Sequence, residues 1–174
     1  MKSKQIRFFA FNAVIAALYA ALTFASAFFG LAYRGVQFRI SEALNVLCLF
    51  TPAAIPGLTV GCFLANLPSD LGPIDWFLGT LATLIAVAGI YFTRNIKFKS
   101  FPFVSLLIPA LANGVIVGVE LTYIIEIFPP DFINFMIQGS LVALGEIAVM
   151  FTLGTLLYYR LLKNPGILDL DKLK

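Results

Sequence analysis

Long runs of apolar residues separated by short polar segments make up most of this chain. Six of these runs predict helices, at 8–29, 38–51, 55–67, 74–92, 103–127 and 134–159. The first and the last three are near or above the roughly 20 residues that a helix needs to cross a bilayer. The second and third, separated by prolines, cover little more than half of that thickness at about 1.5 Å per residue. They predict either short tilted spans or a re-entrant hairpin, and either arrangement leaves both chain ends on one side.

This pattern predicts an all-α integral membrane protein, a six-helix bundle that forms a single membrane domain over residues 1–174. The composition agrees, because 60% of the residues are hydrophobic and 12% are charged, with a mean hydropathy of +0.95. Soluble domains have about a quarter of their residues charged. The lipid bilayer is therefore the expected surroundings. No convincing internal repeat is visible, which argues against an inverted-repeat secondary transporter.

Several classes of chemistry lack their residues in this sequence. There is no histidine, so imidazole metal sites and histidine-based triads are excluded, and no metal site is expected. No G-x-x-x-x-G-K-[ST] motif is present, so the chain is not expected to hydrolyse ATP in the P-loop manner. The two cysteines, Cys48 and Cys62, stand in apolar runs and are interpreted as packing residues. We expect no enzyme and no nucleic-acid partner.

The basic residues indicate an orientation. Ten of the twelve fall before the first run, in the 93–102 loop or after the last run, and only Arg34 and Arg39 fall on the other side. By the positive-inside rule, both termini and that loop are cytoplasmic, in a multi-pass protein of the cell membrane. The basic start and Ala25-Ser26-Ala27 also imitate a signal peptide. The apolar stretch is longer than the usual ~7–15 residues, so we interpret it as the first helix.

Polar residues inside the apolar runs are candidates for a binding site, because ionisable groups in a membrane are unfavourable. The candidates are Arg39, Glu42, Asn45, Asn66, Asp75, Trp76, Asn113, Glu120, Gln138 and Glu146. Under the orientation above, most of them lie in the outer half, with Asn113 and Glu146 near mid-membrane. The pattern predicts a pocket open to the outside.

Each candidate also has a purely structural interpretation. Asp75 and Trp76 could be a helix start and an interfacial anchor, and Arg39 with Glu42 could be a rim ion pair. Glu120 could bind a cationic or donor-rich ligand, carry protons, or be protonated and bonded to a neighbouring helix. The same three interpretations apply to Glu146.

The first helix carries a face of small residues. The residues on this face are Ala13, Ala16, Ala17, Ala20 and Ala21. Such a face lets another helix approach closely in lipid. The spacing does not decide whether that helix belongs to this chain or to a partner.

Three segments and one helix motif resemble a known family. They are 36–44 (VQFRISEAL), 50–58 (FTPAAIPGL), 72–76 (GPIDW), and Gly114 to Gly118 followed by Glu120 and Leu121. The chain resembles the queuosine-precursor transporter (QueT) family, whose members are S components of energy-coupling-factor (ECF) importers. Cys48 stands where proline is expected in that family, and Asn45 where threonine is commoner, which puts Asn45 in doubt as a shared ligand contact.

The resemblance implies a six-helix subunit of the ECF S-component type that captures a 7-deazaguanine, such as preQ1, preQ0 or queuine, at its outer face. It also implies partners: the membrane scaffold EcfT, against which the alanine face of the first helix would dock, and two ATPase subunits. ATP would be used by those subunits, and this chain would hold no cofactor.

A guanine-like edge has adjacent N–H donors that suit a carboxylate, a carbonyl that suits arginine or an amide, and a flat ring that suits an aromatic side chain. On that chemistry Glu42, Glu120 and Asp75 are the candidate carboxylates and Trp76 the candidate stacking surface. Arg39, Asn66 and Gln138 are the candidate guanidinium or amide contacts.

Two other functions compete with this hypothesis. A proton-coupled carrier working alone would use Glu120 and Glu146 as its relay. The small size of the chain and its one-sided polarity argue against this function. An intramembrane enzyme would need a catalytic motif, and we find none.

Overall fold

The computed structural model describes residues 2–30 and 38–165 of the chain. In the described residues the elements are α1 (Lys2–Phe28), η1 (Ile40–Leu49), η2 (Pro52–Ala54), α2 (Ile55–Asn66), α3 (Pro73–Thr93), α4 (Phe103–Val119), η3 (Glu120–Ile124), α5 (Phe132–Val149), η4 (Met150–Gly154) and α6 (Thr155–Lys163). The π-helical turn η3 continues α4, and the π-helical turn η4 joins α5 to α6. These elements form six helical rods, and the prediction of an all-helical membrane protein is confirmed.

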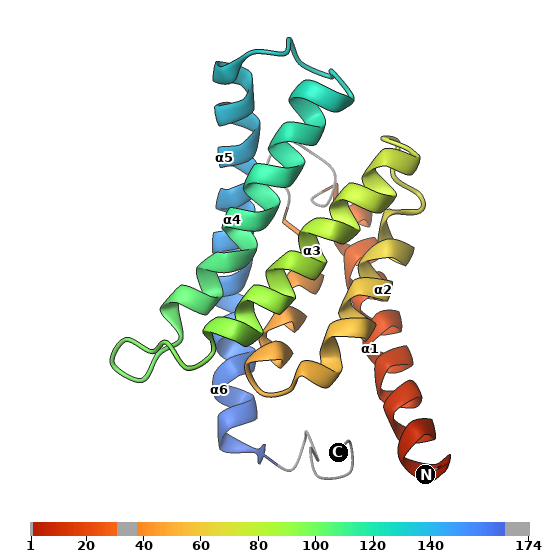
Figure 1. The fold of residues 1–174 in the computed structure, drawn as a ribbon, viewed down its shortest axis with the longest axis vertical. Helices are drawn as coiled ribbons and strands as arrows, with labels where there is room; N and C mark the ends of the chain where they lie inside the picture. The colour runs from red at the N-terminus through yellow and green to blue at the C-terminus, as the bar shows by residue number, and fades with distance from the viewer. Residues whose placement is uncertain (1, 31–37, 166–174) are drawn as a thin grey trace.

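Four of the rods are long and apolar enough to cross a bilayer: Ser3–Phe28, Pro73–Thr93, Phe103–Ile124 and Phe132–Lys163. The other two are short. η1 has ten residues in 3-10 geometry, which rise about 20 Å, and α2 has twelve residues, which rise about 18 Å. In Figure 1, η1 begins near the middle of the bundle's height and descends to the lower end, and α2 climbs back toward the top. Neither helix alone matches the ~30 Å of hydrocarbon.

The rods alternate in direction, so that the start of α1 and the end of α6 lie at the same end of the bundle (Figure 1). The connection between α3 and α4 lies at this end too, where a tight turn with positive φ at Lys99 and Ser100 reverses the chain. The connections from α2 to α3 and from α4 to α5 lie at the opposite end. Apart from Arg39, the basic residues in the described part of the chain therefore lie at the end that contains the start of α1, which we call the basic end.

η1 lies at the centre of the fold and contacts α1, α3, η4 and α6. Its buried apolar residues Val46, Leu47 and Cys48 join the main hydrophobic cluster together with residues of α1, α2 and α3. Both cysteines are free and buried, as their interpretation as packing residues requires. The first half of η1 carries polar residues, and the fold places them in the interior, away from lipid.

Candidate functional site

The inner face of α1 is polar. Its residues are not among the binding-site candidates predicted from the sequence. Asn12, Tyr19, Thr23 and Ser26 are buried, whereas Val14, Leu18 and Phe24 of the same helix are exposed. Their separations of seven, four and three residues put them on one helix face. This spacing was readable, because a polar stripe on an otherwise apolar membrane helix faces the protein.

Glu42 at the start of η1 is held by two neighbours. The hydroxyl of Tyr19 donates a hydrogen bond to Oε1, and Asn45 Nδ2 donates one to Oε2 at 2.5 Å. One residue earlier, Ser41 and Thr23 are joined through their hydroxyls at 2.7 Å. Glu42 is 1% exposed, so these donors replace the water that its carboxylate has lost.

A second group of contacts joins η1 to α2 and α3. Arg39 Nη1 donates to Asn66 Oδ1 at 3.2 Å, and Asn66 Nδ2 reaches the backbone oxygen of Asp75 at 3.4 Å. A Cβ added at Gly79 would stand 2.5 Å from Asn66 Nδ2 and 3.1 Å from Asp75 Oδ1. Glycine at this position therefore leaves room for the side chains of Asn66 and Asp75.

Two further carboxylates come from η3, at the end of α4, and from α5. Asn113 Nδ2 donates to Glu146 Oε1 at 2.8 Å. Glu146 lies within electrostatic range of Glu42 and Arg39, and Glu120 lies within range of Asp75 and Arg39. Arg39 is thus the common neighbour of these acidic side chains.

We call the converging set the polar cluster. It consists of Arg39, Glu42, Asn45, Asn66, Asp75, Asn113, Glu120 and Glu146, all of them buried. Trp76 follows Asp75 on the first turn of α3 and is half-buried. Gln138 is buried on α5, but no hydrogen bond within the described residues connects it to the cluster.

Buried polar atoms in this region lack hydrogen-bond partners. Among the described residues they are Asn45 Oδ1, Asp75 Oδ2, Trp76 Nε1, Glu120 Oε1 and Oε2, Thr122 Oγ1 and Glu146 Oε2. Buried polar groups in proteins are almost always paired, and an unpaired one is destabilising by about 1–3 kcal/mol. Such a concentration of unpaired atoms is typical of a site completed by a ligand. Thr122 was not among the sequence candidates, and its place in the π turn gave no signal.

Comparison with known proteins now identifies the family. The model of the QueT transporter family matches residues 9–163. The chain is also 29% identical over 149 residues, 80% of its length and 83% of the relative's, to the queuosine precursor transporter QueT of Lactococcus lactis subsp. cremoris (strain MG1363). This chain belongs to the QueT transporter family. No solved structure matches it.

Membership confirms the resemblance read in the sequence. The QueT transporter family is a family of transporters, which agrees with the expectation that the chain is not an enzyme. The match runs from α1 to α6, so it includes every helix that contributes to the polar cluster. As a member with several apolar helices, the chain is a multi-pass membrane protein.

The alanines of α1 in this QueT family member divide between two faces. Ala16 and Ala20 are buried, and a Cβ added at Gly61 of α2 would stand 3.0 Å from Ala16 Cα. Ala13, Ala17 and Ala21 are exposed on the outer side of the bundle. The structure therefore assigns two of the five to packing within this chain and leaves three on the surface.

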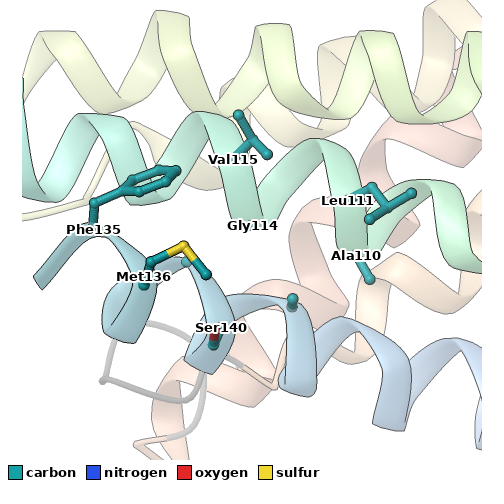
Figure 2. Close-up of a pocket in the computed structure, with 9 residues that line it drawn as sticks. Ala110, Leu111, Gly114, Val115, Phe135, Met136 and Ser140 are labelled. Carbon is teal, nitrogen blue, oxygen red and sulfur yellow. The ribbon is translucent and has the colours of Figure 1, made fainter. Parts of the chain in front are cut away.

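A groove of about 230 Å³ lies between α4 and α5. No residue of the polar cluster lines it. Figure 2 shows Ala110, Leu111 and Val115 on one wall and Phe135, Met136 and Ser140 on the other. Its floor exists because α4 and α5 approach closely: a Cβ at Gly114 would stand 2.9 Å from the backbone oxygen of Gly139. No charged residue lines it, so it lacks the groups that would fix a polar ligand.

Proposed function

We propose that this chain is the substrate-binding subunit of an ATP-driven ECF-type importer and that its polar cluster binds a 7-deazaguanine queuosine precursor, namely preQ1, preQ0, queuine or a related base. The support is the family match, the name of the relative from Lactococcus lactis, and the composition of the unpaired atoms. That composition is the observation on which the proposal rests.

The unpaired atoms in the described part of the chain are mostly acceptors. Five are carboxylate or amide oxygens, one is the hydroxyl of Thr122, and one is the N–H donor of Trp76. A ligand that satisfies them must carry several N–H donors and few acceptors. A 7-deazaguanine has this character, because N1, N9 and the exocyclic amine donate, whereas only the carbonyl and N3 accept.

The hydrogen-bonding chemistry of each residue indicates which part of the ligand it would contact. Asp75 and Glu120, which lie within electrostatic range of one another, would take the adjacent N–H groups of the guanine-like edge, and Trp76 would offer its ring face or its N–H. Arg39 and Asn66 would bind the carbonyl, since both carry donors there. Asn45, Asn113, Gln138 and Glu146 are proposed as further contacts at greater depth.

The charge of the cluster favours a cationic ligand. Four carboxylates, Glu42, Asp75, Glu120 and Glu146, face one arginine among the described residues. An aminomethyl cation, as in preQ1, would stabilise the ionised form of one of these carboxylates in a region where water cannot. We therefore expect preQ1 to bind more tightly than preQ0, which carries a nitrile at that position.

The basic end supports the orientation that we propose for the chain in the membrane. If the positive-inside rule holds, the start of α1, the α3–α4 connection and the end of α6 are cytoplasmic, and the starts of α3 and α5 face outward. Asp75 and Glu120 then belong to the outer half of the bundle, from which the ligand would enter.

In this proposal the exposed alanines of α1 form the surface that docks on the scaffold. Ala13, Ala17 and Ala21 leave a shallow strip on the outer face of α1 that a helix of the scaffold EcfT could approach closely. Two ATPase subunits bound to that scaffold would hydrolyse ATP, since this chain has no phosphate-binding motif.

The test has two parts. Calorimetry on the purified protein should show binding of preQ1, weaker binding of preQ0 and no binding of adenine, whose edge presents a different donor pattern. Uptake in cells should require the ATPase subunits. Uptake that persists without them would instead favour the proton-coupled carrier, and binding of none of the 7-deazaguanines would refute the ligand assignment.

A further inference from the structure

A cavity at the basic end of the bundle is separate from the polar cluster. Its volume is about 210 Å³, and it is lined by Leu49, Phe50, Arg94, Lys97, Pro102, Tyr158 and Leu162. The lining comes from the end of η1, the α3–α4 connection and α6. It combines two cationic side chains with an aromatic and aliphatic wall, and no acidic residue lines it.

The guanidinium of Arg94 is held in place before any ligand arrives. Nη1 donates to the backbone oxygen of Tyr91 at 2.6 Å, and the guanidinium carbon stands 3.7 Å from the centre of the Tyr91 ring. An arginine has five N–H donors, so most remain for an anion. A cation fixed in this way loses less conformational entropy on binding than a mobile one.

The opposite wall of the cavity is also fixed. The rings of Phe50 and Tyr158 are 5.8 Å apart, and the ring of Phe101 packs edge-on against Tyr158 at 6.3 Å. The hydroxyl of Tyr158 points to the backbone oxygen of Ser100 at 3.5 Å, which ties α6 to the α3–α4 turn. The cavity is therefore a formed feature of the fold.

The length of α3 places the cavity near the expected depth of lipid phosphates. α3 has 21 residues and spans about 31 Å, close to the hydrocarbon thickness, and Arg94 follows directly at its end. In the described part of the chain, the carboxylates lie in η1, α3, η3, α5 or the connections at the other end, and none lies at the basic end. No acidic side chain lines the cavity beside Arg94 and Lys97, so an anion bound there would offset their charge.

We propose that this cavity binds the headgroup phosphate of an anionic phospholipid from the leaflet at the basic end. Arg94 and Lys97 contact the phosphate, while Leu49 and Leu162 face the glycerol and the first methylenes of the acyl chains. Basic pockets between membrane helices are known to bind such headgroups, and each basic residue contributes about 1 kcal/mol. The proposal concerns a structural lipid and is independent of which ligand fills the polar cluster.

The test uses short-chain lipids added to the purified protein in neutral detergent. Dihexanoyl phosphatidylglycerol should bind and raise the unfolding temperature, and dihexanoyl phosphatidylcholine should do neither. Lys97→Gln should weaken phosphatidylglycerol binding about five-fold, which corresponds to the roughly 1 kcal/mol per basic residue. Arg94→Gln should weaken it more, because this residue is the fixed one.

Arg7→Gln is the matched control, since it removes a charge at the same end, on the exposed side of α1 and outside the cavity. It should leave binding unchanged. Lys97 is exposed, so its replacement tests the proposal even if Arg94→Gln fails to fold. Equal binding of the two lipids, or an equal loss in Arg7→Gln and Lys97→Gln, would overturn the proposal. Glycerol phosphate binding as tightly as the lipid would also overturn it, by showing that the anion is a soluble one.

Discussion

The hydroxyl of Tyr19 donates a hydrogen bond to the buried carboxylate of Glu42, and this bond connects the middle of α1 to the start of η1. Tyr19→Phe removes the donor and leaves one oxygen of Glu42 without that partner. We expect a loss of about 1–3 kcal/mol in unfolding free energy, together with weaker binding of preQ1. Chemical denaturation and calorimetry measure the two effects. Tyr159→Phe, an exposed position on α6, should change neither.

The carboxylates of the polar cluster give the second prediction. Glu120→Gln and Glu42→Gln should each weaken a 7-deazaguanine ligand by about 1–3 kcal/mol, the scale of a lost charged hydrogen bond. Calorimetry measures the change directly. Asp169→Asn, at a position that follows α6 in the sequence, serves as the control and should bind as wild type does. Unchanged affinity in both glutamate variants would move the site elsewhere.

Gly79 offers a test of the contact between Asn66 and Asp75. In Gly79→Ala the new methyl group would stand 2.5 Å from Asn66 Nδ2, so the amide must move and its bond with Arg39 is disturbed. We expect ligand affinity to fall at least ten-fold while the protein stays folded. Gly89→Ala on the same helix is the matched control, because its Cβ would come about equally close, 2.6 Å, to Cγ2 of Ile108, an apolar side chain outside the polar cluster. Equal affinities in the two variants would contradict the role assigned to Gly79.

The two faces of α1 can be separated by a pair of substitutions. Ala17→Trp projects from the exposed face, so ligand binding should survive while copurification with EcfT and uptake fail. Ala16→Trp projects into the contact with Gly61, and overpacking there should lower stability and ligand binding together, by about 1–3 kcal/mol or more. Normal uptake in Ala17→Trp would rule out docking through this face.

The orientation is tested by labelling single cysteines at positions 97 and 70, which lie beyond opposite ends of α3. With Cys48 and Cys62 replaced by alanine, an impermeant thiol reagent added to intact cells should label Asp70→Cys and spare Lys97→Cys. Labelling at position 97 alone would show that the topology is the reverse of the one proposed, with the start of α3 in the cytoplasm.

Much of the fold could be predicted because a bilayer imposes length and polarity on each helix. The apolar runs predicted six helices, and deep carboxylates such as Glu120 and Glu146 were expected to be functional because lipid does not tolerate them. The same rule should have selected Tyr19 and Thr23, whose hydroxyls stand on the inner face of α1. Hydroxyls are less unfavourable in apolar surroundings than charges, so a buried hydroxyl is a weaker indication of a site than a buried carboxylate.

The pairing of the polar residues could not be predicted. Whether Asn113 meets Glu146, or Arg39 meets Asn66, depends on how each helix is rotated and how close it stands to its neighbours. Those quantities are set by contacts between glycines, such as Gly114 with Gly139, that lie far apart in the sequence. Nor does the sequence of η1 announce its 3-10 geometry, since its residues are compatible with an ordinary α-helix.

The number of residues in the π turn that begins at Glu120 sets the direction of this side chain relative to the segment that follows. A π turn holds one residue more than the α-helix that it interrupts, and each residue turns an α-helix by roughly 100°. Deleting one residue between 121 and 124 would restore regular bonding but swing Glu120 away from Asp75 relative to the segment that follows. The connections outside the helices tolerate insertions and deletions, whereas this turn should tolerate neither, even where every side chain of the cluster is retained.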